Sequence, residues 1–252
     1  MAVAFDAVGP SSSGLTWTSN ATQSWTHTAG TGGGTVLVYL AMGIDVGGAV
    51  GAVGSFSSVT YGGNAMTLLG SVASNNDNQG AIFCYGITGQ ASGANTVAIG
   101  TYTPPSGSGF ASGIGVSVSF TGGIQFGTAV TAYGDAASGS VAITTADTTG
   151  LCVAGVCDGS GGEAPTAGTQ RWLEDLNPNS AGGNTIGITL ASNGGTTTLS
   201  WTQTTDQYGV VGVEVQAGAG ITAGPPLGLQ SLARPPVVVP VISGWRNAGH
   251  SR

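Results

Sequence analysis

Few side chains in this sequence could carry out catalysis. The 252 residues include two histidines, three cysteines and four arginines, but no lysine. Without lysine, the chain cannot form a P-loop, a lysine Schiff base or a Ser–Lys dyad. His27 lies in the polar segment Trp25–Thr28, where we expect a solvated or hydrogen-bonded surface histidine rather than a general base, and His250 lies in the C-terminal region. We therefore predict that the protein is not an enzyme.

The acidic residues are also poorly arranged for chemistry. Paired carboxylates can hydrolyse glycosidic bonds, and Glu174-Asp175 is the only adjacent pair in the chain. Adjacent residues of a strand point to opposite faces, so a glycan hydrolase is the least favoured function, and an ion pair with Arg171 is expected instead. The segment Asn75–Gly80 offers oxygen ligands but only one carboxylate, which favours a turn over a calcium site. We expect neither a metal nor a cofactor.

The three cysteines are predicted to be core residues. Cys84, Cys152 and Cys157 each lie in an apolar, strand-like run. An odd number of cysteines without a secretion signal indicates reduced thiols, which behave as small hydrophobic side chains. Cys152 and Cys157 differ in parity, so in one strand they point to opposite faces and cannot share a metal ion.

The elements that position these residues are predicted to be β-strands. Only 6% of the residues are charged, and the polar residues are mainly Thr, Ser, Asn and Gly, which suit strands and tight turns rather than exposed helices. The repeated alternation predicts an all-β fold, an antiparallel β-sandwich or jelly roll. The expected strands are Ala2–Val8, Gly14–Trp17, Ser24–Thr28, Thr35–Met42, Ser58–Tyr61, Met66–Ser71, Ala81–Gly86, Thr96–Thr101, Gly113–Thr121, Val130–Ala132, Gly139–Thr144, Leu151–Cys157, Gln170–Leu176, Thr185–Leu190, Thr197–Gln203 and Gly209–Gln216.

The strand pattern suggests a weak internal duplication. Segments of the first half have counterparts, in the same order and at similar spacing, in the second half. We expect the two halves to interleave in one sandwich, because neither has enough strands to bury two faces well alone. The corresponding pairs are Thr35–Leu40 with Gly150–Gly155, Val59–Thr67 with Thr166–Trp172, Thr96–Ile99 with Thr197–Trp201, and Gly115–Phe120 with Gly209–Val215.

Charge divides the chain into two parts. Residues 1–220, the body, hold all eleven carboxylates and one arginine, Arg171, whereas residues 221–252, the arm, hold three arginines and no carboxylate. The formal net charge of the whole chain is −7. Phosphate binding needs clustered Lys and Arg, so an acidic body argues against DNA or RNA as a partner. We expect a single β-sandwich domain in the body, followed by an extended basic arm.

The arm is predicted to dock on neighbouring subunits. Its run Pro235–Ile242 is apolar and contains three prolines, and such a run is a liability when left bare in water. Prolines restrict strand pairing to an edge or a groove contact, and Trp and Arg are common interface anchors. The residues expected to bind the partner are Leu227, Leu229, Leu232, Arg234, Val237, Val239, Val241, Trp245, Arg246 and Arg252.

Targeting signals are not apparent in the sequence. The segment Met1–Asp6 has no basic region followed by a cleavable apolar stretch, and no apolar stretch approaches the ~18–20 residues of a transmembrane helix. We therefore expect synthesis in a cytoplasm, with no membrane partner.

One segment carries a resemblance to a known family. Val59–Thr67, read as V-T-Y-G-G-N-A-M-T, resembles a segment of a β-sandwich family found in structural proteins of tailed bacteriophages and in bacterial surface proteins. The similarity continues at Phe83–Gly86, Ser92–Val97 and Ser117–Gly122 and resumes at Leu199–Trp201 and Val210–Val215. This resemblance implies a β-sandwich and no catalytic residues.

Two functions follow as expectations. The absence of a secretion signal and the basic arm favour a phage virion protein over a secreted member of the family. We expect a capsid accessory or decoration protein, or a minor tail protein, that contacts major capsid or tail proteins and forms a homo-oligomer. The alternative is a carbohydrate-binding module for host cell-surface glycans, with Trp17, Trp25, Trp172 and Tyr133 as candidate sugar platforms.

Overall fold

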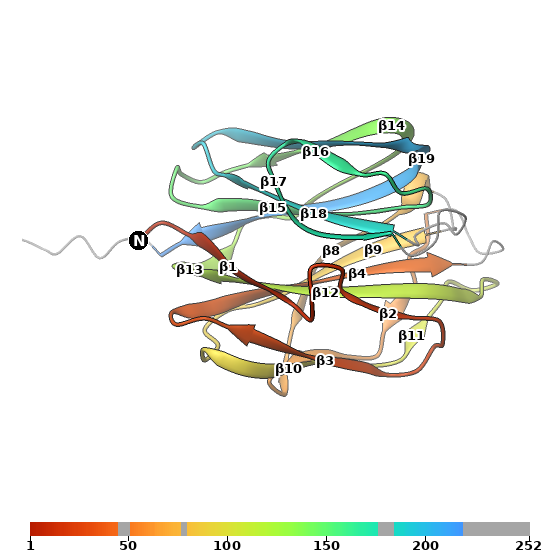
Figure 1. Cartoon of the computed structure of the whole chain (residues 1–252), viewed down its shortest axis with the longest axis horizontal. Helices are drawn as coiled ribbons and strands as arrows, with labels where there is room; N and C mark the ends of the chain where they lie inside the picture. Colours follow the sequence, from red (N-terminus) through yellow and green to blue (C-terminus); the bar gives the residue numbers. More distant parts are fainter. Residues whose placement is uncertain (45–50, 77–79, 176–183, 219–252) are drawn as a thin grey trace, which may run out of the picture. The chain divides into compact units, whose positions relative to one another are not determined.

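The computed structural model confirms an all-β, antiparallel fold for the body. It describes residues 1–44, 51–76, 80–175 and 184–218, and Met1–Gly220 form one compact unit. Apart from the short 3-10 turn η1 (Ser74–Asn76), every regular element that is described is a strand. No helix in the described ranges has the length and apolarity needed to cross a membrane. The strands stack in layers, with β14 and β16 at one side of the stack and β3 and β10 at the other (Figure 1).

The first half of the body forms one sandwich. One of its sheets has the order β1-β12-β4-β9-β8, with β2 also paired to β12, and the facing sheet has the order β3-β10-β6-β7. A short pair, β5 with β11, lies outside these sheets. The strands are β1 (Ala4–Gly9), β2 (Leu15–Trp17), β3 (Gln23–Ala29), β4 (Gly33–Ile44), β5 (Ser55–Phe56), β6 (Val59–Tyr61), β7 (Asn64–Ala65), β8 (Thr67–Ala73), β9 (Gly80–Ile87), β10 (Gly93–Ile99), β11 (Tyr102–Thr103) and β12 (Phe110–Thr121).

The second half forms a sandwich from one continuous sheet. Its order is β13-β19-β15-β18-β17, and β14 and β16 also pair with β19. β14 pairs with both parts of the 22-residue β19, whereas β16 pairs only with its first part and β15 only with its second part. The sheet therefore covers both sides of one core. The strands are β13 (Gly123–Phe126), β14 (Val130–Thr144), β15 (Leu151–Asp158), β16 (Ala164–Ala167), β17 (Thr169–Asp175), β18 (Asn184–Ala191) and β19 (Thr196–Ala217).

The two halves have the same topology. The order β1-β12-β4-β9-β8 matches β13-β19-β15-β18-β17 strand for strand. Two strands of the second half are continuous where the first half has two separate strands. The single strand β14 corresponds to β2 and β3, and the single strand β19 corresponds to β10 and β12. A register shift occurs at the same point of β8 and β17, between Leu68 and Gly70 in one and between Gln170 and Trp172 in the other. The segments paired in the sequence therefore occupy equivalent strands.

The predicted interleaving of the halves is wrong. Every strand pair in the described part of the chain joins two strands of the same half. Each half has its own buried cluster between its layers, and a third cluster joins the halves face to face. In β4, even-numbered residues such as Leu40 enter the first-half core, whereas odd-numbered residues such as Tyr39 enter the interface between the halves. The central strands are thus covered on both faces, which lets two small sandwiches stabilise one another.

Aromatic rings of this interface lie on glycines. Tyr39 and Trp172 are each 1% exposed, and their ring centroids are 5.2 Å apart. A Cβ atom on Gly155 would lie 2.3 Å from the Tyr39 ring, and one on Gly187 would lie 2.0 Å from the Trp172 ring. Gly155 and Gly187 are themselves paired neighbours in β15 and β18. The missing side chains therefore create the space that the two rings fill.

The segment Val59–Thr67 forms the link between the two sheets of the first half. Val59 and Tyr61 are buried in β6, and Gly62 and Gly63 turn the chain with φ values of 55° and 81°. Only glycine adopts such angles without strain, so the pair allows the tight hairpin from β6 to β7. The chain then enters β8 in the other sheet.

Candidate docking groove

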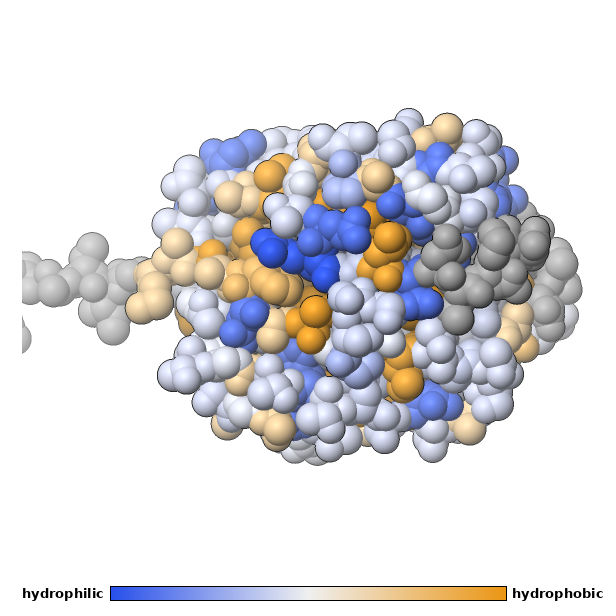
Figure 2. Space-filling model, viewed as in Figure 1, coloured by the Kyte–Doolittle hydropathy of each residue, from blue (hydrophilic) through white to orange (hydrophobic). Residues whose placement is uncertain are grey.

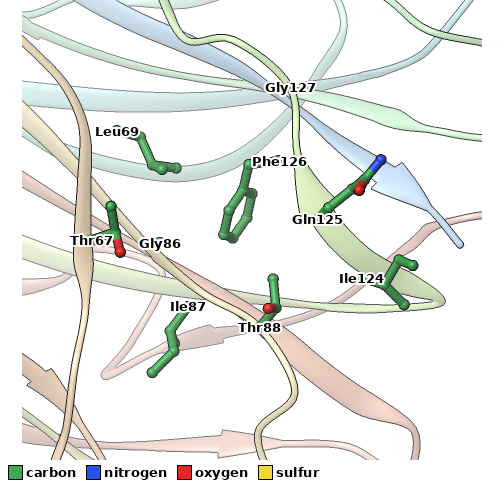
Figure 3. Close-up of a pocket in the computed structure, with 9 residues that line it drawn as sticks. All are labelled: Thr67, Leu69, Gly86, Ile87, Thr88, Ile124, Gln125, Phe126 and Gly127. Atoms are coloured by element: carbon green, nitrogen blue, oxygen red, sulfur yellow. The ribbon is translucent and has the colours of Figure 1, made fainter.

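A hollow lined by both apolar and polar residues opens between the two halves. It has a volume of about 430 Å³ and lies between β8 and β9 of the first half and β13 of the second. Figure 3 shows the Phe126 ring at its centre, with Leu69 beside it. We call this hollow the groove; it is lined by Thr67, Leu69, Gly86, Ile87, Thr88, Ile124, Gln125, Phe126 and Gly127.

Two sheet edges border the groove. β8 and β13 are the end strands of their sheets, each paired with a single neighbour among the described strands. Ile124 in β13 is 57% exposed and is one of the few large apolar side chains on the described surface. End strands beside an apolar surface can accept an additional extended segment, because their outer backbone groups have no strand partner. The groove is therefore suited to binding a peptide.

The face shown in Figure 2 has little to attract an apolar partner. On the face shown in Figure 2, most atoms have intermediate hydropathy, and strongly hydrophobic residues form only small separate patches. This matches a surface built from Thr, Ser, Gly and Asn rather than from charged residues.

His27 is buried, contrary to the prediction of a surface residue. Its Nδ1 atom lies 2.9 Å from Ser117 Oγ, and Trp25 Nε1 donates a hydrogen bond of 2.9 Å to the same oxygen. Ser117 also lies 3.2 Å from the Gly9 carbonyl, which can accept its proton. A Ser–His pair can activate a nucleophile, but both residues are fully buried, so this network connects the sheets of the first sandwich instead. The alternation of Trp25, His27 and Ala29 along β3 could have revealed the burial.

Burial of His27 predicts a pH-dependent stability. Desolvation lowers the pKa of His27 from 6.5, and the Asp6 carboxylate partly opposes this shift. Above 6.5 the imidazole is neutral in both states; as the pH falls further, the unfolded chain binds the proton first and folding is weakened. We expect the urea midpoint to fall between about pH 7.5 and 5.5, and His27→Gln to reduce this fall. The matched variant His250→Gln should behave like the parent, and an unchanged pH profile in His27→Gln would contradict the prediction.

The prediction that the cysteines are core residues is confirmed. All three are free and fully buried, with Cys84 and Cys157 in the interface between the halves and Cys152 in the core of the second half. Burial raises the pKa of Cys84 and of Cys157 to about 12. The described residues include no group of three or more His, Cys, Asp or Glu side chains able to hold a metal ion. Of the segment Asn75–Gly80, residues 77–79 lie outside the described residues, and Asn75 adopts the left-handed backbone of a turn.

Arg171 makes contacts that the sequence did not predict. Its guanidinium lies 4.1 Å from the centroid of the Phe5 ring, and its Nε donates a 2.7 Å hydrogen bond to Thr189 Oγ1. Among the described side chains Arg171 has no ion pair with Glu174; the Asp175 side chain lies outside the described residues, so an ion pair with Asp175 stays a prediction. Arg171 therefore connects β17 of the second half to β1 of the first by a cation–π contact.

The candidate sugar platforms are mostly unavailable. Trp17, Trp25 and Trp172 are all buried, and only Tyr133, at 50% exposure, remains on the surface. Buried rings cannot stack on a glycan, so no exposed row of these aromatics exists. Trp172 instead belongs to the buried cluster between the two halves.

The predicted partner-binding residues cannot be placed. Leu227, Leu229, Leu232, Arg234, Val237, Val239, Val241, Trp245, Arg246 and Arg252 all lie outside the described residues. The groove was not predicted from the sequence, since its lining comes from three strands of two halves. The available signal was the spacing of Ile124 and Phe126, two large apolar residues that lie two positions apart in a short strand.

Comparison with protein-family models, with curated proteins and with solved structures finds no match for the chain. The resemblance of the Val59–Thr67 segment to phage structural proteins therefore stays a prediction.

Proposed function

We propose that the protein is a non-enzymatic structural subunit of a tailed-phage virion, in which the arm fastens the body to neighbouring subunits. The observation that carries the proposal is the combination of an arm rich in valine, proline and arginine with an acidic body that bears a groove of mixed polar and apolar lining between two sheet edges. The apolar side chains of the arm match those of the groove, and the arginines of the arm match the net negative charge of the body as a whole. A location on the capsid or on the tail would be compatible with this role.

The body is well suited to a repeated building block. His27 and Ser117 are residue types that can take part in catalysis, but here they are buried and hydrogen-bond to one another. The two stacked sandwiches share one apolar interface and so present a rigid support. The resemblance of Val59–Thr67 supports the virion setting, and the formal charge of the arm favours contact with acidic subunits such as further copies of the body.

Amide hydrogen exchange tests the fastening role of the arm. We expect peptides covering residues 235–242 to exchange at least about tenfold more slowly in assembled particles than in the dilute chain, because docking would protect their amides. A peptide covering β15, which is buried in both states, should exchange equally slowly in each and serves as the control. Equal, rapid exchange of 235–242 in both states would refute the proposal.

A further inference from the structure

The internal duplication supplies a comparison for the groove. Because the β8–β9 and β17–β18 ladders share the same register, Leu69 is equivalent to Arg171 and Gly86 to Thr189. Phe5 and Phe126 are equivalent as well, since each lies opposite the matching residue of β12 or β19. The Phe5 end of the interface and the Phe126 end are thus two versions of one arrangement.

The two ends differ in what covers the phenylalanine. At the Phe5 end, the Arg171 guanidinium lies over the ring and is held by Thr189. At the Phe126 end, the shorter Leu69 and Gly86 occupy the same positions, and the groove lies beside the ring. The groove therefore lies at the end of the interface where the position equivalent to Arg171 is occupied by Leu69, so no arginine covers the phenylalanine there. An incoming arginine could reproduce the contact with Phe126.

The arm contains a segment with this chemistry. Arg234 immediately precedes the apolar run Pro235–Ile242. An arginine could stack on Phe126 while the valines that follow contact Leu69, Ile87 and Ile124. No other arginine of the arm directly precedes an apolar run of this length.

The spacing of the prolines suits attachment to one sheet edge. Successive residues of a strand direct their N–H groups to opposite sides, so Val237, Val239 and Val241 would direct theirs to one side. Pro236 and Pro240, which have no N–H, then fall on the other side, whereas Pro235 falls on the side of the valines, so pairing would begin at Val237. Such a segment can pair with one exposed edge, and its outer side cannot recruit a further strand through those positions.

The course of the chain favours a second copy as the source of the segment. β19 runs antiparallel to β13 and ends at Ala217, opposite Gly123, so the chain leaves the body heading away from Phe126. The sequence Gly224-Pro225-Pro226 that follows favours an extended, semi-rigid spacer. Val237 is then about 20 residues beyond the body, roughly 60 Å when extended at ~3.1 Å per residue. A reach of this size carries the run to a neighbouring molecule.

We propose that the groove formed by Leu69, Ile87, Ile124 and Phe126 binds the segment Arg234–Ile242 of a second copy of this chain, with Arg234 over Phe126 and the valine run along the edge of β8 or β13. This inference rests on the proposed function and adds the identity of the partner and of its receptor site. Copies would connect head to tail, which produces rings or open chains of subunits.

Complementation between two full-length variants tests the proposal. Ile124→Asp places a charge in the groove and leaves the arm intact, whereas Val239→Pro removes an N–H that faces the edge and leaves the groove intact. Each variant alone should remain monomeric in sedimentation velocity at concentrations where the parent associates. An equimolar mixture should form a 1:1 dimer, because the arm of the first variant can bind the groove of the second.

Two matched variants control for general damage. Leu68→Asp changes an exposed apolar residue next to the groove but not in its lining, and Val238→Pro adds a proline whose lost N–H faces away from the edge. Both should associate like the parent. Thermal unfolding should be unchanged in Ile124→Asp and Leu68→Asp, since Ile124 and Leu68 are 57% and 46% exposed.

Other outcomes would overturn the proposal in distinguishable ways. A monomeric parent whose arm is protected from protease, but becomes sensitive in Ile124→Asp, would show that the arm binds its own groove. A monomeric parent whose arm is as sensitive to protease as the arm of Ile124→Asp would show that the groove is not the receptor. If the arm were nevertheless protected in particles, the proposed function would stand and the arm would bind a different partner. Equal loss of association in Val238→Pro and Val239→Pro would refute pairing with a single edge.

Discussion

Replacing Gly155 with alanine is expected to destabilise the protein by about 1–3 kcal/mol, the usual cost of overpacking a well-filled core. The new Cβ would lie 2.3 Å from the Tyr39 ring, which is 1% exposed and is enclosed by the Trp172 ring. Tyr39 belongs to the first half and Gly155 to the second, so the added methyl group would push the halves apart. Chemical denaturation of both proteins measures the difference.

A double-mutant cycle isolates the contact. Tyr39→Leu alone should also destabilise, because it leaves a cavity, but Gly155→Ala should cost less in the Tyr39→Leu background than in the parent. Gly195→Ala is the matched control, since Gly195 is exposed and its nearest neighbouring atom lies 3.7 Å from the added Cβ. Additive effects of Tyr39→Leu and Gly155→Ala would contradict the proposed packing of ring on glycine.

The glycines illustrate what sequence patterns predict well and poorly. The turn at Gly62-Gly63 follows from the sequence, because the adjacent glycines lie between two strand-like segments. Gly155 and Gly187 lie in strand interiors, where the sequence gives no indication of the ring above them. Their role depends on which residues of another strand face them, and this requires the register.

The strands and the duplication were largely predictable, whereas the stacking of the halves was not. Period-two alternation identifies strands such as Gln23–Ala29, which is half-buried. A single interleaved sandwich is expected from the sequence because neither half has enough strands to bury two faces well alone. The nearly continuous apolar run Thr35–Met42 indicates a strand buried on both faces, and this signal argues for more than two layers.

The groove illustrates a second limit. Its asymmetry comes from one substitution between equivalent positions, leucine at position 69 and arginine at position 171. Equivalence of these positions follows from the matching register shifts, which no composition or spacing argument provides. The arm residues that we expect to fill the groove were found from composition alone, because apolar, proline and arginine residues are concentrated there.

Removal of the arm is expected to have the largest effect on assembly. The body is a compact unit with its own cores, so a chain lacking residues 221–252 should keep its strand content and its thermal midpoint. The same chain should lose the apolar and arginine contacts to its neighbours. Every ~1.4 kcal/mol of lost binding energy weakens association tenfold. Particles should therefore contain fewer copies of the shortened chain than of the full chain, by a factor of at least about ten.

The direct measurement is the number of copies per purified particle, for the full chain and for the chain without residues 221–252, produced at equal levels. The fastening role predicts abundant incorporation of the full chain and near absence of the folded, shortened one. Equal incorporation of the two chains would show that the body attaches by itself and would contradict the account.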